Sequence, residues 1–237
     1  MTEQEKKELQ ERVKSVIERV NNAAVQAGRD PSEITLVAAT KMNDAERVQA
    51  AIEAGIRVCG ENRVQELQEK YEQNAYDGAD LQFIGTLQTN KVKYLIGKVS
   101  LIQSVGSVHL GEAIAKEAEK RGVCQDILLE VNIGREENKS GVMPEQLEEL
   151  LCQIAELDGI SVKGLMAIPP ICESSQKISE FFNKMHNIFI DISQKKLDNI
   201  DMNILSMGMS ADYYEAVLAG ANMVRVGSAL FGARNYT

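Results

Sequence analysis

The sequence contains no tryptophan, and aromatic residues make up only 5% of its 237 residues. Hydrophobic residues nevertheless account for 44% of the chain, an ordinary share for a globular protein. A core built from this composition must therefore be mostly aliphatic. A chain of this length suits one large domain or two small ones and is long enough to bury a sizeable core.

Cysteine and histidine are also scarce, with four cysteines, no C-x-x-C pair and two histidines. The scattered cysteines do not have the dense spacing of a disulfide framework. So few cysteines and histidines leave little choice of ligands for a zinc site. We therefore expect reduced thiols, a cytoplasmic protein and no bound metal.

An excess of basic charge is missing as well. The chain has 26 basic and 35 acidic residues, which gives a net charge of −9. This balance argues against nucleic acid and anionic membranes as partners, because both select basic surfaces. It still allows a local basic pocket for a small anion.

Long apolar runs are absent too. No stretch approaches the roughly 18 residues that a membrane span needs, and residues 1–7 are charged rather than arranged as a signal peptide. We therefore expect no membrane segment and no secretion signal.

Residues 2–27 have the pattern of a long amphipathic helix. Thr2 and Glu5 fit a capping box at its start, and Gly28 provides a stop. The apolar stripe recurs at helical spacing. It consists of Leu9, Val13, Val16, Ile17, Val20 and Ala24.

After this helix, short apolar runs alternate with helical segments. Regular alternation of strand and helix indicates a parallel sheet, and eight such units in about 200 residues favour a closed barrel over an open sheet. We predict an α/β fold: one domain over 1–237, a (β/α)8 TIM barrel with the extra N-terminal helix outside it or across its bottom. The eight expected strands are 34–40, 57–60, 81–85, 101–105, 126–132, 160–166, 203–206 and 222–226.

Two segments near the C-terminus have the composition of phosphate-binding loops. Residues 206–210 follow the seventh expected strand and residues 225–228 the eighth, the two places where such barrels often hold phosphate. Both contain glycine and serine, and a helix is expected just beyond each. Glycine lets the backbone approach a ligand, and exposed amides with a hydroxyl suit a phosphate dianion. Tight turns use the same residues, but the two segments together favour phosphate binding.

Lys41 follows the first apolar strand and so lies at the expected barrel mouth. Part of its stem is then buried, and partial desolvation lowers the pKa of an amine. Imine formation requires the neutral amine that this lowering favours. On position alone, the competing interpretation is an ordinary solvated charge.

Six segments occur in a fixed order along the chain. They are AATK at 38–41, GENRVQE at 60–66, FIGTLQTNK at 83–91, GLMAIP at 164–169, LSMGMSAD at 205–212 and MVRVGSALFGAR at 223–234. Together they resemble the pyridoxal phosphate homeostasis protein family, the small relative of the alanine racemase barrel. The resemblance covers essentially the whole chain.

The resemblance implies a cofactor, pyridoxal 5′-phosphate (PLP), held on Lys41 as a Schiff base. It implies that Arg225 faces the pyridine nitrogen of the cofactor and that Asn62 lies near the ring. The residues that it assigns to the phosphate are Ser206, Gly227 and Ser228.

The chain departs from the family pattern at three positions. The family often has histidine where Gln82 stands and a basic residue or proline where Thr86 stands. These two departures put any role of those side chains in doubt. Ser228 replaces a frequent threonine but keeps the hydroxyl.

The resemblance implies intracellular PLP homeostasis, in which the protein buffers or delivers the cofactor to PLP-dependent apo-enzymes without substantial turnover. An arginine beside the ring nitrogen disfavours the pyridinium form, which weakens the electron sink that PLP enzymes use. In the related racemases a tyrosine from a separate C-terminal domain acts as the second acid, and this sequence ends at Thr237, directly after the last barrel unit. We therefore expect no catalytic residues. Separately, we expect a monomer.

Two alternatives remain. One is a minimal PLP-dependent amino-acid racemase with Tyr213 or Tyr214 as the acid. The other is a phosphate-binding barrel enzyme that never meets PLP and uses Lys41 for an imine with a sugar phosphate.

Overall fold

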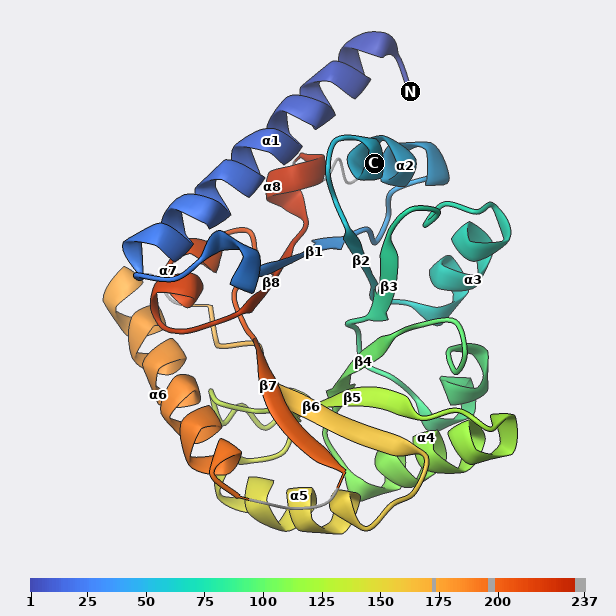
Figure 1. The fold of residues 1–237 in the computed structure, drawn as a ribbon, viewed down its shortest axis with the longest axis vertical. Helices are drawn as coiled ribbons and strands as arrows, with labels where there is room; N and C mark the ends of the chain where they lie inside the picture. The colour runs from blue at the N-terminus through green and yellow to red at the C-terminus, as the bar shows by residue number, and fades with distance from the viewer. Residues whose placement is uncertain (172–173, 196–198, 233–237) are drawn as a thin grey trace.

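The computed structural model describes residues 1–171, 174–195 and 199–232. Its eight strands form one closed parallel barrel in which each strand pairs with the next along the chain and β8 pairs with β1 (Figure 1). The predicted (β/α)8 barrel is therefore confirmed. The strands are β1 (Thr35–Ala39), β2 (Val58–Glu61), β3 (Asp80–Phe83), β4 (Leu101–Val105), β5 (Gln125–Val131), β6 (Ile160–Ala167), β7 (Ile200–Ser206) and β8 (Met223–Val226).

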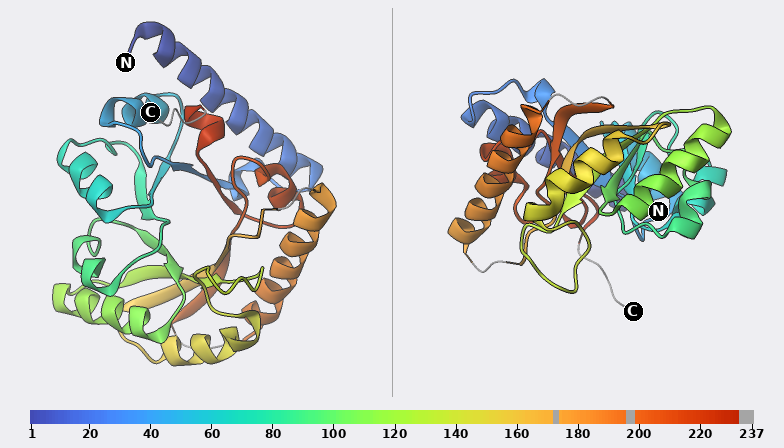
Figure 2. Two further views of the ribbon diagram at one scale, coloured as in Figure 1. Left: turned by 180° about the vertical axis from the view of Figure 1, so that it is seen from behind. Right: turned by 90° about the horizontal axis from the view of Figure 1, so that it is seen from below.

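Helices surround the barrel on its outside (Figure 2). The long connection after β5 projects from one end of the barrel in the same figure, where it is yellow-green. The α-helices are α1 (Glu3–Gln26), α2 (Ala45–Glu53), α3 (Val64–Glu72), α4 (Val108–Arg121), α5 (Leu147–Ala155), α6 (Ser175–Ser193), α7 (Tyr213–Leu218) and α8 (Ser228–Phe231). The 3-10 helices are η1 (Pro31–Glu33), η2 (Thr89–Tyr94) and η3 (Pro144–Gln146).

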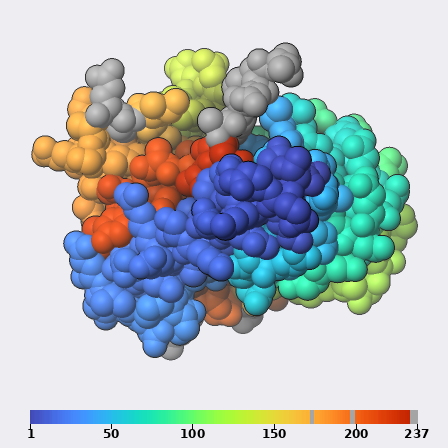
Figure 3. Space-filling model, turned by 90° about the horizontal axis from the view of Figure 1, so that it is seen from above, coloured from blue at the N-terminus to red at the C-terminus, as the bar shows by residue number. Residues whose placement is uncertain are grey.

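The N-terminal helix α1 takes the place that a full-length eighth helix would occupy. The Thr2 hydroxyl accepts a hydrogen bond from the Glu5 amide, and the Glu5 carboxylate accepts one from the Thr2 amide, so the predicted capping box is present. Because α8 is only four residues long, it leaves the outside of the barrel uncovered where β8 meets β1. The helix α1 packs there against α7, α8 and α2, on the outer surface (Figure 3).

Side chains from the strands form two layers, because successive residues of a strand point to opposite faces. One layer packs between the strands and the surrounding helices. The other fills the inside of the barrel. Its buried hydrophobic members are Val37, Ala39, Ile84, Leu101, Leu128, Met166 and Met223.

Most strand bounds shift by one or two residues from the prediction, and two elements differ further. The segment through Lys91 that we expected to be an α-helix is the 3-10 helix η2, and its amides bond three residues back, as from Lys91 to Gln88. The seventh strand begins at Ile200 rather than 203. The prediction missed its first residues because they alternate between half-buried and exposed positions and so do not form an apolar run. Within the described residues, no helix has both the length and the apolar character to cross a membrane.

Candidate functional site

Inward positions at the ends of neighbouring strands place the predicted residues around one barrel mouth. Ala39, the last residue of β1, belongs to the inner layer, and Lys41 lies in the turn two residues further along the chain. Met223 is likewise inside, and Arg225 and Gly227 follow it at intervals of two. Since β8 pairs with β1, the turn that carries Lys41 follows the strand next to the one that carries Arg225.

Asn62 directly follows β2, and Ser206 is the last residue of β7. Asn62 lies two residues after Gly60, whose α-carbon faces inner-layer side chains of Val37 and Ile84. Ser206 lies two residues after Ile204, which packs against the inner layer. The closed barrel thus brings toward one mouth two residues that are 144 positions apart in the sequence, from 62 to 206.

Arg225 is buried, with 4% of its surface exposed, inside the barrel. Its Nη1 donates to the Ser206 hydroxyl at 2.5 Å, and its Nη2 donates to the Ala167 carbonyl at 3.0 Å. Burial lowers the pKa of Arg225 to about 10, while the charges of Glu130 and Asp212 oppose this. A pKa of about 10 leaves the guanidinium charged at neutral pH.

Behind Arg225, a chain of buried amides crosses the barrel interior. The Ser206 hydroxyl donates to Gln103 Oε1 at 2.7 Å, and Gln103 Nε2 donates to Gln82 Oε1 at 2.7 Å. Ser206 and Gln103 are 0% exposed, so the hydroxyl that we predicted to bind phosphate is occupied by two protein groups. Gln82, whose role the sequence left in doubt, lies inside the barrel as the far member of this chain, whereas Thr86 is exposed.

Two backbone amides after β8 converge on a serine from the loop after β7. The amides of Gly227 and Ala229 both donate to the Ser210 hydroxyl oxygen, at 3.0 and 3.2 Å. Ser228, between them, is exposed. The arrangement has three polar groups that suit an oxyanion: two amides and a hydroxyl.

Asn62 has a buried side-chain oxygen, Oδ1, with no hydrogen-bond partner among the described residues. A buried acceptor left unpaired is costly unless a ligand or water satisfies it. Gly85 packs directly on this residue, since a Cβ there would lie 2.1 Å from the Asn62 carbonyl oxygen. The backbone of Asn62 is thus closely packed against Gly85, and its side chain has one acceptor without a partner among the described residues.

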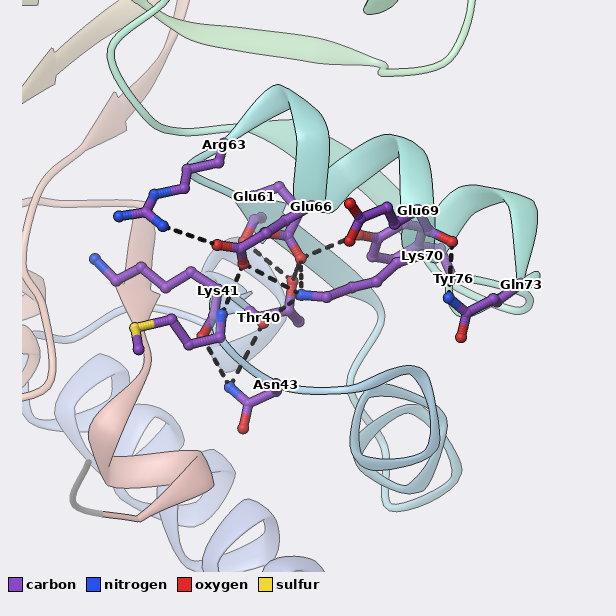
Figure 4. Close-up of polar contacts among 12 residues, drawn as sticks. Thr40, Lys41, Asn43, Glu61, Arg63, Glu66, Glu69, Lys70, Gln73 and Tyr76 are labelled. Atoms are coloured by element: carbon purple, nitrogen blue, oxygen red, sulfur yellow. Dashed lines mark hydrogen bonds and ion pairs between the residues drawn. The ribbon is translucent and has the colours of Figure 1, made fainter. Parts of the chain in front are cut away.

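Lys41 is half-buried and lies just after the end of β1. Its side chain extends away from Lys70 and toward the same side as Arg63 (Figure 4). Lys70 Nζ donates to the carbonyl of Thr40 at 2.8 Å and to Glu61 Oε1 at 2.6 Å. The outward residues of these two strand ends thus form a polar network, while the inward residues form the site.

The two tyrosines that the racemase alternative requires lie against α1. The guanidinium carbon of Arg19 is 5.8 Å from the ring centre of Tyr213 and 5.6 Å from that of Tyr214. The Tyr214 hydroxyl donates to Gln26 Oε1 at 2.6 Å. Both side chains therefore pack on the outer helix.

The sequence interpretation missed Ser210, Gln103 and the network around Glu61. Ser210 was visible as part of a phosphate-type segment, although its own contacts were not. Glu61 offered a signal that we did not use: a carboxylate inside a strand must find partners when it is buried. Gln103 offered a similar signal within β4. Among the described residues there is no cluster of three or more metal-ligating side chains.

Comparisons with known sequences agree on one family. The family model described as alanine racemase, N-terminal domain, matches residues 15–235. A curated relative from Aquifex aeolicus, named pyridoxal phosphate homeostasis protein, is 43% identical over 228 residues, which cover 95% of this chain and 98% of the relative. A relative of the same name from Escherichia coli is 33% identical and covers 94% of this chain and 95% of its own.

Solved structures extend the comparison to three dimensions. A structure of PipY from Synechococcus elongatus with PLP bound has a TM-score of 0.78 and 30% identity, and the match covers 92% of this chain and 100% of that one. A crystal structure described as that of an unknown protein from Bifidobacterium adolescentis has a TM-score of 0.92 and 34% identity, covering 98% of this chain and 97% of that one. An alanine racemase from Clostridium difficile, at 15% identity and TM-score 0.71, shares the fold over 94% of this chain and 57% of its own.

Proposed function

Because this chain belongs to the pyridoxal phosphate homeostasis protein family, we propose that it binds PLP and buffers or delivers the cofactor within the cell. One observation carries the proposal: adjacent strands place Lys41, the buried Arg225 guanidinium and the two amides at Ser210 around one barrel mouth. These groups correspond to the three ends of the cofactor, its aldehyde, its ring nitrogen and its phosphate. The Asn62 side-chain oxygen, which has no partner among the described residues, supports the placement of Asn62 beside the PLP ring.

In this proposal the phosphate is held by the turn after β8. The amides of Gly227 and Ala229 already converge on one oxygen, that of Ser210, and a phosphate oxygen suits the same donors. The exposed hydroxyl of Ser228 adds a further donor. Ser206 contributes through Arg225, because its hydroxyl accepts from the guanidinium and donates to Gln103.

At the ring end, Arg225 decides which chemistry the protein supports. PLP, when bound, supplies an aldehyde that condenses with amines and a ring that stabilises carbanions when its nitrogen is protonated. A guanidinium can donate hydrogen bonds but cannot accept one. Arg225 therefore favours the unprotonated ring nitrogen, and this supports a holder of PLP rather than a catalyst.

The outward placement of the two tyrosines favours the same role over the minimal racemase. Racemisation needs a second acid across the mouth from Lys41. Tyr213 and Tyr214 instead contact Arg19 and Gln26 of α1. The recipients that this role requires are PLP-dependent apo-enzymes, and we expect a cytoplasmic monomer to serve them.

A comparison of transfer and turnover tests the proposed role. PLP-loaded protein is divided into two samples. The first is incubated with a PLP-dependent apo-aminotransferase, and the second, without the aminotransferase, with single amino acids. We expect the aminotransferase to regain activity. In the second incubation, chiral analysis and keto-acid release should remain far below ordinary turnover of about 1–10³ per second. Turnover in that range would refute the carrier role, and an aminotransferase that stays inactive would refute delivery. Lys41→Ala protein taken through the same loading is the control.

A further inference from the structure

The turn that carries Lys41 has a backbone conformation that few side chains adopt. Met42, the next residue, has a φ of 62°, in the left-handed region. For a residue other than glycine this conformation is costly and persists only where the surroundings hold it. The Met42 side chain is 61% exposed, so packing of that side chain does little to hold the turn.

Side chains from α3 and from the turn itself hold it instead, and each bonds the backbone. The Met42 amide donates to Glu66 Oε2 at 2.8 Å. The Asn43 side-chain amide donates to the Lys41 carbonyl at 3.1 Å, and Lys70 Nζ donates to the Thr40 carbonyl at 2.8 Å. Three consecutive residues are therefore held at their backbones, while the Lys41 side chain extends the other way (Figure 4).

The charges behind the turn keep the second lysine out of the site. Lys70 is 7% exposed and pairs with Glu61 Oε1 at 2.6 Å and with Glu66 Oε2 at 3.8 Å. Glu61 is 0% exposed and also accepts from the Thr40 hydroxyl at 2.6 Å and from the Tyr76 hydroxyl at 3.0 Å. Two lysines thus lie near the end of β1: the Lys41 side chain extends away from the network, whereas Lys70 is paired with two carboxylates within it (Figure 4).

We propose that Glu66 and Lys70 are positioning residues that hold the turn at 40–42 so that Lys41 Nζ reaches the aldehyde of PLP. This inference rests on the proposed function. In the step concerned, Lys41 Nζ forms a bond to the aldehyde carbon, the carbonyl C–O bond breaks, and the oxygen leaves as water with two protons from the nitrogen. No oxidant or reductant is needed. The turn controls this covalent step, whereas the phosphate end depends on groups after β7 and β8.

The consequence is a separation between attachment and binding. Pyridoxine 5′-phosphate carries an alcohol in place of the aldehyde and can bind but not attach. Loosening the turn should therefore slow attachment of PLP and leave the affinity for pyridoxine 5′-phosphate unchanged. A change that merely destabilised the barrel would affect both.

Glu66→Ala is the sharpest perturbation, because Glu66 is partly exposed, with 20% of its side chain accessible, and its removal leaves Lys70 paired with Glu61. Glu66→Gln keeps an oxygen that can accept the Met42 amide. Glu69→Ala is the matched control: Glu69 lies on the same helix, is exposed, and makes the same change of charge. Attachment is followed by stopped-flow absorbance and by borohydride trapping, and affinity by calorimetry with pyridoxine 5′-phosphate.

We expect Glu66→Ala to attach PLP about ten- to a hundredfold more slowly, the range for losing a hydrogen bond to a charged group. Glu66→Gln and Glu69→Ala should stay within about threefold of the unaltered protein. Attachment by Glu66→Ala at the unaltered rate would overturn the inference. So would a loss of pyridoxine 5′-phosphate affinity equal to the loss of rate. Unaltered protein that binds neither compound would instead overturn the proposed function, and binding of both without any trapped adduct would overturn the attachment on which the inference depends.

Discussion

Replacing Lys70 by methionine tests how strongly the network behind the site stabilises the fold. Lys70→Met removes the only cation that lies within hydrogen-bonding distance of Glu61 among the described residues, at 2.6 Å, and Glu61 is 0% exposed. The carboxylate keeps two neutral donors, the Thr40 and Tyr76 hydroxyls, while its Oε2 has no partner within the described chain. An uncompensated buried charge is what makes such a change costly.

The expected cost is about 3–5 kcal/mol, the usual penalty for breaking a buried ion pair by removing one partner. A domain of this kind has about 5–15 kcal/mol of total stability, so the variant should lose a large part of it. Removing both charges should be much milder, because a neutral amide at position 61 can still accept from Thr40 and Tyr76. We therefore expect the double variant Glu61→Gln/Lys70→Met to recover at least half of the loss.

Urea unfolding followed by circular dichroism measures these differences. Lys116→Met is the control, since Lys116 is exposed on α4 and its replacement should change the free energy of unfolding by less than about 0.5 kcal/mol. The reasoning is refuted if Lys70→Met unfolds at the same urea concentration as the unaltered protein. It is equally refuted if the double variant is no more stable than Lys70→Met alone.

Three further predictions concern the rest of the barrel. Burial raises the pKa of Glu130 above its usual 4.5, so ionisation of Glu130 costs stability as pH rises from about 4.5 through the raised value. Glu130→Gln should therefore stabilise the protein at pH 7 but not at pH 4. An equal effect on urea unfolding at both pH values would contradict this. Gly164→Ala should cost more than about 2 kcal/mol and lower the melting temperature, because a Cβ there would lie 1.8 Å from the Ile204 carbonyl oxygen. Burial raises the pKa of Cys59 to about 12. Iodoacetamide at pH 8 should therefore label the exposed Cys124 in the native protein and Cys59 only after unfolding. Peptide mass spectrometry measures the labelling at each cysteine.

The sequence predicted the barrel well because its strands are marked by short apolar runs between helices with clear stops. The fourth strand coincides with the expected 101–105, and α4 ends at Gly122 in the left-handed conformation that favours glycine. The prediction of an α-helix at η2 was wrong because the same periodicity fits a short 3-10 helix. The sequence also could not tell that α1 completes the outer layer beside the one-turn α8, since that depends on packing between distant segments.

The site was predicted in outline, from inward positions at strand ends and from the family resemblance. Its support was not, because hydrogen bonds between side chains on different strands leave no periodic mark in the sequence. Ser206 illustrates the limit: its hydroxyl lies between Arg225 and Gln103, a partner 103 positions away. Glu66 and Lys70 were visible only as a helical pair four residues apart, and their contacts with the turn of Lys41 required the fold.

The covalent attachment of PLP to Lys41 is the central claim, and peptide mapping tests it most directly. The protein is loaded with PLP, reduced with borohydride, digested and analysed by mass spectrometry. We predict one stoichiometric adduct on Lys41 and its loss in Lys41→Ala, with the absorbance band of the bound cofactor lost as well. A full adduct on another lysine, or a Lys41→Ala protein that still traps PLP to the same extent, would contradict it.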